Sequence, residues 1–212
     1  MKKECYIVAG GSSLIDFDFL KLMGKDVITV NKAFFAYPNC KYFITMDFTF
    51  LKKVSTQKSI FKRSRCTKIF IGNLCPSYME EKNGAIVDTR WNLVYNLAMF
   101  DVIIKSRRVS FLGYAFNDFA HGLNSGFCAL QLAIVLGYTE IHLLGMDMNV
   151  ENKTHFHEGY GESVESFNEK LKLYYTNMKE SILDFHAEER GINIYSCSKT
   201  SSLNKFLEYK EL

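Results

Sequence analysis

The chain has 212 residues, 48% of them hydrophobic, which is enough for one domain with a sizeable buried core. Its formal net charge of +3 is too small to favour nucleic acid as a partner. The N-terminus is too short and polar for a signal peptide, and no stretch of about 18 apolar residues predicts a transmembrane helix. Together with six cysteines that lack zinc-ligand spacing, these features predict a cytoplasmic protein with reduced thiols.

The first strong signal lies at the start of the chain, where the apolar run Cys5–Ala9 leads directly into Gly10, Gly11, Ser12 and Ser13. This order predicts a buried strand, a tight glycine-rich turn and the start of a helix. Glycines let the backbone approach a ligand closely, and a helix N-terminus attracts anions. The turn does not match GxGxxG, so it does not specifically indicate a dinucleotide.

Apolar runs and periodic segments alternate along the rest of the chain. Further strands are predicted at Val27–Val30, Tyr42–Thr45, Lys68–Ile71, Arg107–Leu112, Glu140–Leu144 and Ile192–Tyr195. Helices are predicted at Trp91–Ile104, Ser125–Leu136, Glu162–Glu189 and Ser201–Leu207. The alternation predicts an α/β fold: a Rossmann-like, mostly parallel sheet with helices on both faces. We expect residues 1–212 to form one domain, with a lid at about 148–165.

Small or polar residues follow several of the predicted strands. Because ligands bind beyond the carboxyl ends of parallel strands, we expect these residues to share a nucleotide site. Each of them could instead serve only as a turn or a helix cap. The predicted nucleotide-binding residues are Gly10, Gly11, Ser12, Ser13, Asn31, Asp47, Asn124, Ser125, Gly126 and Asp147, the three at 124–126 lying at a helix start.

A polar, histidine-rich segment follows Asp147, where a lid would lie. His155 and His157 are alternate residues, so in an extended loop they point in opposite directions and only one faces the site. Such a histidine could take a proton from an acceptor hydroxyl, and Tyr160 could donate to a leaving phosphate. A solvated surface loop and a zinc site at His155, His157 and Glu158 are the alternatives, and the His-x-His spacing alone is weak evidence for zinc.

The segments Asn124–Gly126, Leu136–Tyr138 and Glu140–Asp147 resemble the core of small bacterial sialyltransferases. In that family a Ser-Gly opens a buried helix that leads into an LGY-x-EI strand and a Gly-x-Asp. The run from Ala9 to Leu14 is similar to the family's nucleotide-binding turn. The resemblance implies a metal-independent, inverting glycosyltransferase. Its donor would be a nucleotide sugar, with a CMP-sugar as one candidate, its acceptor a glycan or other hydroxyl, and it would need no cofactor.

The same segments resemble 6-hydroxymethylpterin diphosphokinase-like proteins, which implies ATP and Mg²⁺ as an alternative, with Asp47 and Asp147 as metal ligands. A non-catalytic binding module is a third alternative. A basic run at residues 52–68 is either a solvated surface or an anion-binding patch, which leaves a peripheral membrane contact open. Formation of a homo-oligomer stays open as well.

Overall fold

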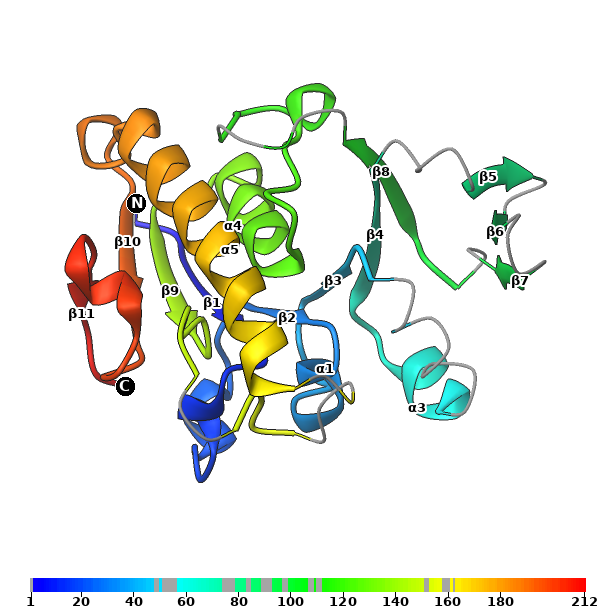
Figure 1. The fold of residues 1–212 in the computed structure, drawn as a ribbon, viewed down its shortest axis with the longest axis horizontal. Coiled ribbons are helices and arrows are strands. Elements are labelled where there is room, and N and C mark those ends of the chain that lie inside the picture. The colour runs from blue at the N-terminus through cyan, green and yellow to red at the C-terminus, as the bar shows by residue number, and fades with distance from the viewer. Residues whose placement is uncertain are drawn as a thin grey trace.

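The computed structural model describes residues 2–47, 50, 57–73, 79–82, 85–88, 93–96, 99–106, 109, 112–150, 153–157, 161 and 163–212. Its centre is an eight-stranded sheet in the order β11-β10-β9-β1-β2-β3-β4-β8 (Figure 1). Every neighbouring pair in this sheet is parallel, which confirms the Rossmann-like α/β prediction. The strands are β1 (Glu4–Val8), β2 (Val27–Val30), β3 (Tyr42–Thr45), β4 (Thr67–Asn73), β8 (Val102–Ser106), β9 (Glu140–Leu144), β10 (Asn193–Ser196) and β11 (Glu208–Tyr209).

Helices cover both faces of the sheet, as predicted. The long helices α4 (Ser125–Val135) and α5 (Val164–Phe185) lie on one face (Figure 1). The short helices α1 (Ala33–Ala36) and α3 (Lys58–Arg63) lie on the other, with the 3-10 helices η1 (Ser12–Leu14) and η2 (Phe19–Leu22). Three more 3-10 helices are η3 (Phe116–Asp118), η4 (Glu188–Arg190) and η5 (Ser202–Lys205).

Strand β1 shows why the central strands read as continuous apolar runs. Cys5 and Ile7 pack into the core beneath α4 and α5, whereas Tyr6 and Val8 pack into the core on the opposite face. A strand covered on both faces needs apolar side chains at every position. Helix α4 is buried nearly all round for the same reason, since it lies between the sheet and α5.

The helix predicted at Trp91–Ile104 is wrong. The structure has strand β7 (Leu93–Asn96) there and then β8, which pairs with β4 through Val102, Ile103 and Ile104. These β-branched side chains favour a strand over a helix. Most of the strand predicted at Arg107–Leu112 lies outside the described residues. Val109 and Leu112, which are described, are not in a strand, and the neighbouring strand β8 spans Val102–Ser106.

A small three-stranded antiparallel sheet was not predicted. It consists of β5 (Met79–Lys82), β6 (Ala85–Asp88) and β7. Helix α5 is shorter than predicted at both ends, and η5 occupies the predicted C-terminal helix. Division of the chain into one domain with a lid stays a prediction.

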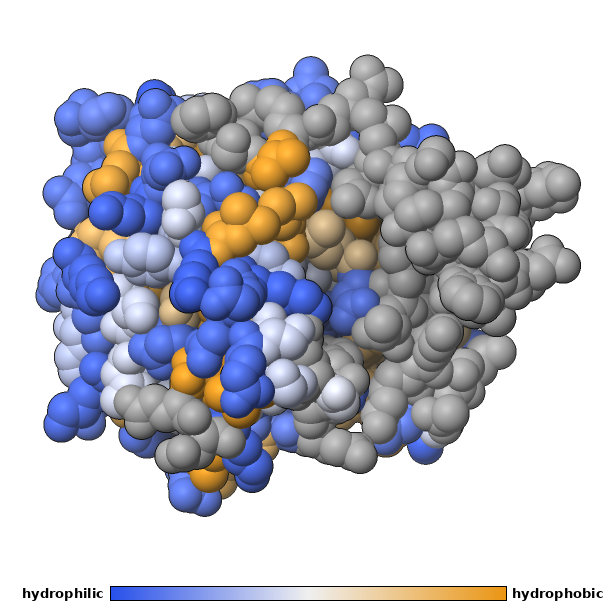
Figure 2. All heavy atoms as spheres, viewed as in Figure 1, coloured by the Kyte–Doolittle hydropathy of each residue, from blue (hydrophilic) through white to orange (hydrophobic). Residues whose placement is uncertain are grey.

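Over the described residues, no helix has the length and apolar character needed to cross a membrane. On the face shown in Figure 2, the described surface is largely hydrophilic, with separate apolar patches between polar side chains. Within the predicted basic run, Lys62 and Arg63 are exposed, but Lys68 is buried and donates to the carbonyl oxygens of Ser64 and Cys66. The run is therefore not a uniformly solvated patch.

Candidate functional site

A cavity of about 720 Å³ lies beyond the carboxyl ends of the central strands, next to the N-terminus of α4. Most of the residues predicted for the nucleotide site line this cavity. Ser12, Ser13 and His157 do not line it, and Tyr160 lies outside the described residues. The predicted residues that line it are Gly10, Gly11, Asn31, Asp47, Asn124, Ser125, Gly126, Asp147 and His155.

The glycine-rich turn after β1 is packed so closely that Gly11 has no room for a side chain. A Cβ on Gly11 would lie 2.5 Å from the carbonyl oxygen of Gly145 and 2.5 Å from Oδ2 of Asp147. The amide of Gly11 donates to that Gly145 carbonyl at 2.8 Å. The turn is thereby joined to the segment after β9, and its backbone forms one wall of the cavity.

Asp147 holds this turn from across the sheet. Its Oδ2 accepts a hydrogen bond from the backbone N–H of Ser13 at 2.9 Å, and its Oδ1 accepts one from the Ser13 hydroxyl at 2.5 Å. Asp147 is buried, so these charge-assisted bonds offset the cost of removing its carboxylate from water. Asp147 thus shapes the site by positioning the turn after β1, and its role as a nucleotide-binding residue stays a prediction.

The ends of β2 and β3 are joined by polar side chains. Oδ1 of Asn31 accepts from the Thr45 hydroxyl at 2.6 Å, and Thr45 Oγ1 in turn accepts from the amide of Asp47 at 3.0 Å. This chain of bonds places Asn31 and Asp47 side by side at the strand ends, where both line the cavity.

The N-terminus of α4 contributes the next part of the wall. Asn124 is the N-cap residue, and its Oδ1 accepts from the amide of Phe127 at 2.8 Å. The Ser125 hydroxyl accepts from the amide of Met46 at 3.0 Å, which ties the helix start to β3. Because the first N–H groups of a helix have no acceptor within it, the amides of Ser125 and Gly126 are suited to bind an anion in the cavity.

Three residues that line the cavity have a strained backbone conformation. Asn31, Leu123 and Met148 all have positive φ, at 52°, 60° and 52°, and all three line the cavity. Leu and Met rarely adopt this conformation, and such strain is found preferentially at ligand-binding and active sites. The strain is therefore a second, independent indication of a functional site.

The two histidines of the predicted lid, His155 and His157, lie together rather than apart. Their rings are stacked, with centroids 4.9 Å apart and an interplanar angle of 24°, so the expectation that they point in opposite directions is wrong. Alternation holds for an extended strand, whereas this loop bends back and the amide of Phe156 donates to the Gly10 carbonyl at 3.1 Å. A Cβ on Gly10 would lie 2.9 Å from Cδ2 of His155 and 3.1 Å from Nε2 of His157.

One face of α5 also lines the cavity and was not predicted to do so. The lining residues are Phe167, Lys170, Leu171 and Tyr174, spaced as i, i+3, i+4 and i+7. This spacing is visible in the sequence, but it is indistinguishable from the stripe that any helix buries against a core. Among the described residues, no group of three or more His, Cys, Asp or Glu side chains is placed to bind a metal ion.

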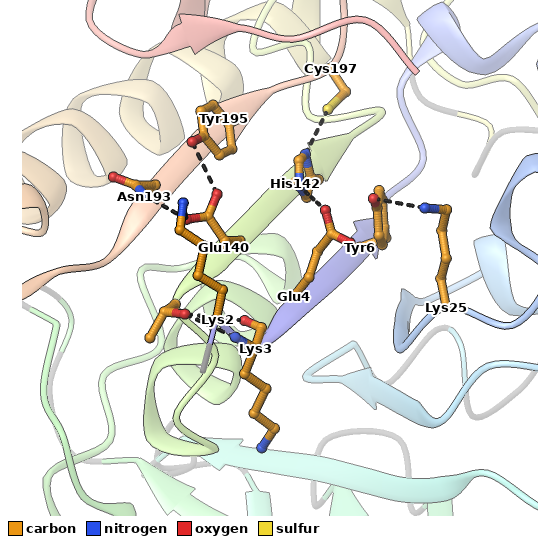
Figure 3. A network of polar contacts seen from close by, with 11 residues as sticks. Lys2, Lys3, Glu4, Tyr6, Lys25, Glu140, His142, Asn193, Tyr195 and Cys197 are labelled. Carbon is orange, nitrogen blue, oxygen red and sulfur yellow. Dashed lines mark hydrogen bonds and ion pairs between the residues drawn. The ribbon is translucent and has the colours of Figure 1, made fainter.

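A second polar cluster lies outside the cavity, on the face of the sheet that α4 and α5 do not cover. Its side chains come from β1, β9 and β10 and their flanking residues (Figure 3). His142 Nε2 lies 2.8 Å from Oε1 of Glu4, and its Nδ1 lies 3.7 Å from Sγ of Cys197. The His142 ring stacks on the rings of Tyr6 and Tyr195. Burial raises the pKa of Cys197 to about 12, so the thiol stays protonated at neutral pH and is not an activated nucleophile. His142 is buried and stacked between two tyrosine rings, so it has a structural role.

No protein-family model and no curated protein matches the chain. Solved structures of the sialyltransferase CstII from Campylobacter jejuni are similar to it: one in complex with CMP-3FNeuAc has a TM-score of 0.58 at 20% identity, and one with cytidine-5'-monophosphate has 0.58 at 22%. The matches cover 98% of this chain and 86% and 84% of those chains. The chain has the CstII sialyltransferase fold. The fold implied by the resemblance to sialyltransferases in the sequence is therefore confirmed.

Proposed function

We propose that the protein is a nucleotide-sugar-dependent glycosyltransferase of the sialyltransferase-like type, metal-independent and inverting. The observation that carries the proposal is the strand-end cavity, which is lined by a close-packed glycine turn and by the first residues of α4. Structures of the same fold hold CMP and a CMP-sugar analogue, which favours a CMP-sugar as donor. A glycan or another hydroxyl compound is the acceptor.

The donor's nucleotide would bind along the glycine turn and the ends of β2 and β3. Asn31 and Asp47 supply amide and carboxylate groups that suit ribose hydroxyls or a base edge. The phosphate would lie where the amides of Ser125 and Gly126 open into the cavity. No cofactor takes part in this chemistry.

The stacked histidines are the candidates for general base. In the reaction, the acceptor oxygen forms a bond to the anomeric carbon, the bond from that carbon to the phosphate oxygen breaks, and its electron pair leaves with the nucleotide. The acceptor's proton passes to an imidazole of His155 or His157. Tyr160, if the lid brings it to the site, would donate to the leaving phosphate.

The arrangement of Asp147 makes the diphosphokinase alternative less favourable. That alternative needs Asp47 and Asp147 as Mg²⁺ ligands, but both oxygens of Asp147 already accept hydrogen bonds from Ser13. Binding a metal through Asp147 would compete with the bonds that hold the glycine turn. We therefore propose glycosyl transfer and not diphosphoryl transfer.

The proposal is tested by incubating the protein with CMP-, UDP- and GDP-sugars in EDTA, with mixed glycan acceptors, and measuring nucleotide release. Release from one donor, lost in the His155→Ala/His157→Ala double variant, is the expected result. Mutating general bases typically costs about 10²- to 10⁴-fold in rate. Release only with Mg²⁺ and ATP would overturn it, as would binding of donors without turnover under any condition.

A further inference from the structure

Among the described residues, His155 is the only histidine that lines the cavity, and its imidazole contacts rings from two parts of the chain. The centroid of the His157 ring lies 4.9 Å from that of His155, at an interplanar angle of 24°. The ring of Phe167, near the start of α5, also lies 4.9 Å away, at 40°. His155 is therefore in contact with an aromatic side chain of a helix as well as with its neighbour in the loop.

The histidines belong to a row of five contacting rings. Phe156 contacts His157 with centroids 5.0 Å apart, and it contacts Phe19 of η2 at 5.8 Å. Of these five rings, only those of His155 and Phe167 belong to residues that line the cavity. The row thus ends at the cavity with an imidazole and with a phenyl ring that is carried by the long helix α5.

Phe167 can fix what the loop leaves free. The χ2 torsion of a histidine has broad minima, so packing sets the plane of the imidazole. The backbone of Phe167 is well held, because its amide donates to the carbonyl of Ser163, the N-cap residue of α5, at 3.0 Å. The adjacent Asn168 donates through Nδ2 to the Val150 carbonyl at 3.2 Å, which joins this turn of the helix to the segment after β9. Side chains on helices position a reacting group more accurately than side chains on loops.

We infer that Phe167 is a positioning residue, whose ring holds the His155 imidazole in the orientation that accepts the proton of the acceptor hydroxyl. The inference rests on the proposed function and assigns the general base to His155, with His157 as part of the packing around it. A general base must lie within hydrogen-bond reach of the proton that it removes, and a misplacement of about 1 Å can cost about 100-fold in rate. Phe167 has no titratable group, so it acts through His155.

NMR spectra test the contact without any substrate. The ring signals of His155 are assigned by their absence from His155→Asn, and nuclear Overhauser effects to the Phe167 ring are measured in the wild type. We expect these effects in the wild type, shifted His155 signals in Phe167→Leu, and signals close to the wild type in Phe167→Tyr, which keeps the ring. Absence of the effects from the folded wild type would overturn the inference.

The matched control is Tyr175→Leu. Tyr175 is another half-buried aromatic residue of α5, and its ring contacts that of Phe206, with centroids 5.9 Å apart. This variant removes a ring from the same helix and should leave the His155 signals unchanged. Thermal unfolding shows whether each variant is folded, and Phe167→Met replaces Phe167→Leu if the leucine variant is not.

Kinetics with the donor and acceptor that support nucleotide release then test the role. Phe167→Leu should lower kcat by about 10- to 100-fold and leave the donor KM nearly unchanged, because the position of the base affects the transition state and not donor binding. Phe167→Tyr should keep most of the wild-type kcat, and Tyr175→Leu all of it. Unchanged kcat in folded Phe167→Leu would overturn this inference alone. A wild type that releases no nucleotide from any donor would overturn the proposed function and this inference with it.

Discussion

Ser13 donates two hydrogen bonds to Asp147, one to each carboxylate oxygen, and so joins the turn after β1 to the end of β9. The two residues are 134 positions apart in the chain. Their strands are neighbours in the centre of the sheet, so the pair fixes the glycine turn at the point where the cavity opens. The carboxylate is thereby a structural part of the site.

Replacing Asp147 should therefore lower both stability and ligand binding. Asp147→Ala leaves the half-buried amide of Ser13 without its acceptor, and we expect the free energy of unfolding to fall by about 2 kcal/mol. Urea denaturation measures this loss. Ser12→Ala is the control, because the Ser12 hydroxyl forms no hydrogen bond with the described residues, and it should change stability by less than about 0.5 kcal/mol. Equal effects of the two variants would contradict the role given to the pair.

Gly11 has no space for a methyl group. In Gly11→Ala the new Cβ would lie 2.5 Å from a backbone carbonyl, which cannot move without displacing β9's end. We expect a loss of about 1 to 3 kcal/mol in unfolding free energy, the usual cost of overpacking. Gly72→Ala is the control, since its Cβ would meet only Phe70, at 3.9 Å. A Gly11→Ala variant as stable as Gly72→Ala would show that the turn is less tightly packed than described.

Gly10→Ala should separate catalysis from stability. Its Cβ would meet only the ends of the His155 and His157 rings, which can shift, so the cost in stability should be below about 1 kcal/mol. The shift would displace the imidazoles, and a displacement of about 1 Å can cost about 100-fold in rate. Histidine NMR shifts and kcat, measured with CMP binding, test this. Unmoved histidine signals with reduced kcat would contradict the explanation.

His142 should make stability depend on pH. Burial lowers its pKa from 6.5; Glu4 and Glu140 oppose this shift and Lys210 adds to it. The folded pKa is thus below the unfolded value, so the unfolded chain binds more protons as the pH falls. Stability from this group is fully present above pH 6.5 and decreases below it.

Urea midpoints measured from pH 6.5 down to about 5 should fall in the wild type and fall less in His142→Gln. The glutamine keeps a polar side chain of similar reach but does not titrate in this range. Identical pH slopes for the two proteins would contradict the assignment to His142.

Much of the sheet could be predicted because its central strands are buried on both faces. Val27–Val30 is apolar or β-branched over its length, and Gly145 marks where the buried run Glu140–Leu144 ends. The edge strand β8 was harder to predict from the sequence. The segment before Val102 has apolar residues at helical spacing, and only pairing with β4 selects the strand.

The sequence was sufficient to predict which strand ends form the site. It was not sufficient to predict the contacts between the side chains there. The sequence places Asn31, Asp47 and Asp147 at one edge of a parallel sheet, and the cavity confirms that they meet there. It does not reveal that Asp147 holds Ser13, because that contact depends on which strands are neighbours. The stacking of His155 on His157 depends on a loop bend, which no periodicity encodes.

The central claim is that the strand-end cavity is the nucleotide site, and a crystal structure determined after soaking with CMP in EDTA tests it most directly. The account predicts density for CMP in the cavity, with its phosphate against the amides of Ser125 and Gly126 and its ribose or base beside Asn31 and Asp47. CMP bound elsewhere on the protein, or present only when Mg²⁺ joins it to Asp147, would contradict the account.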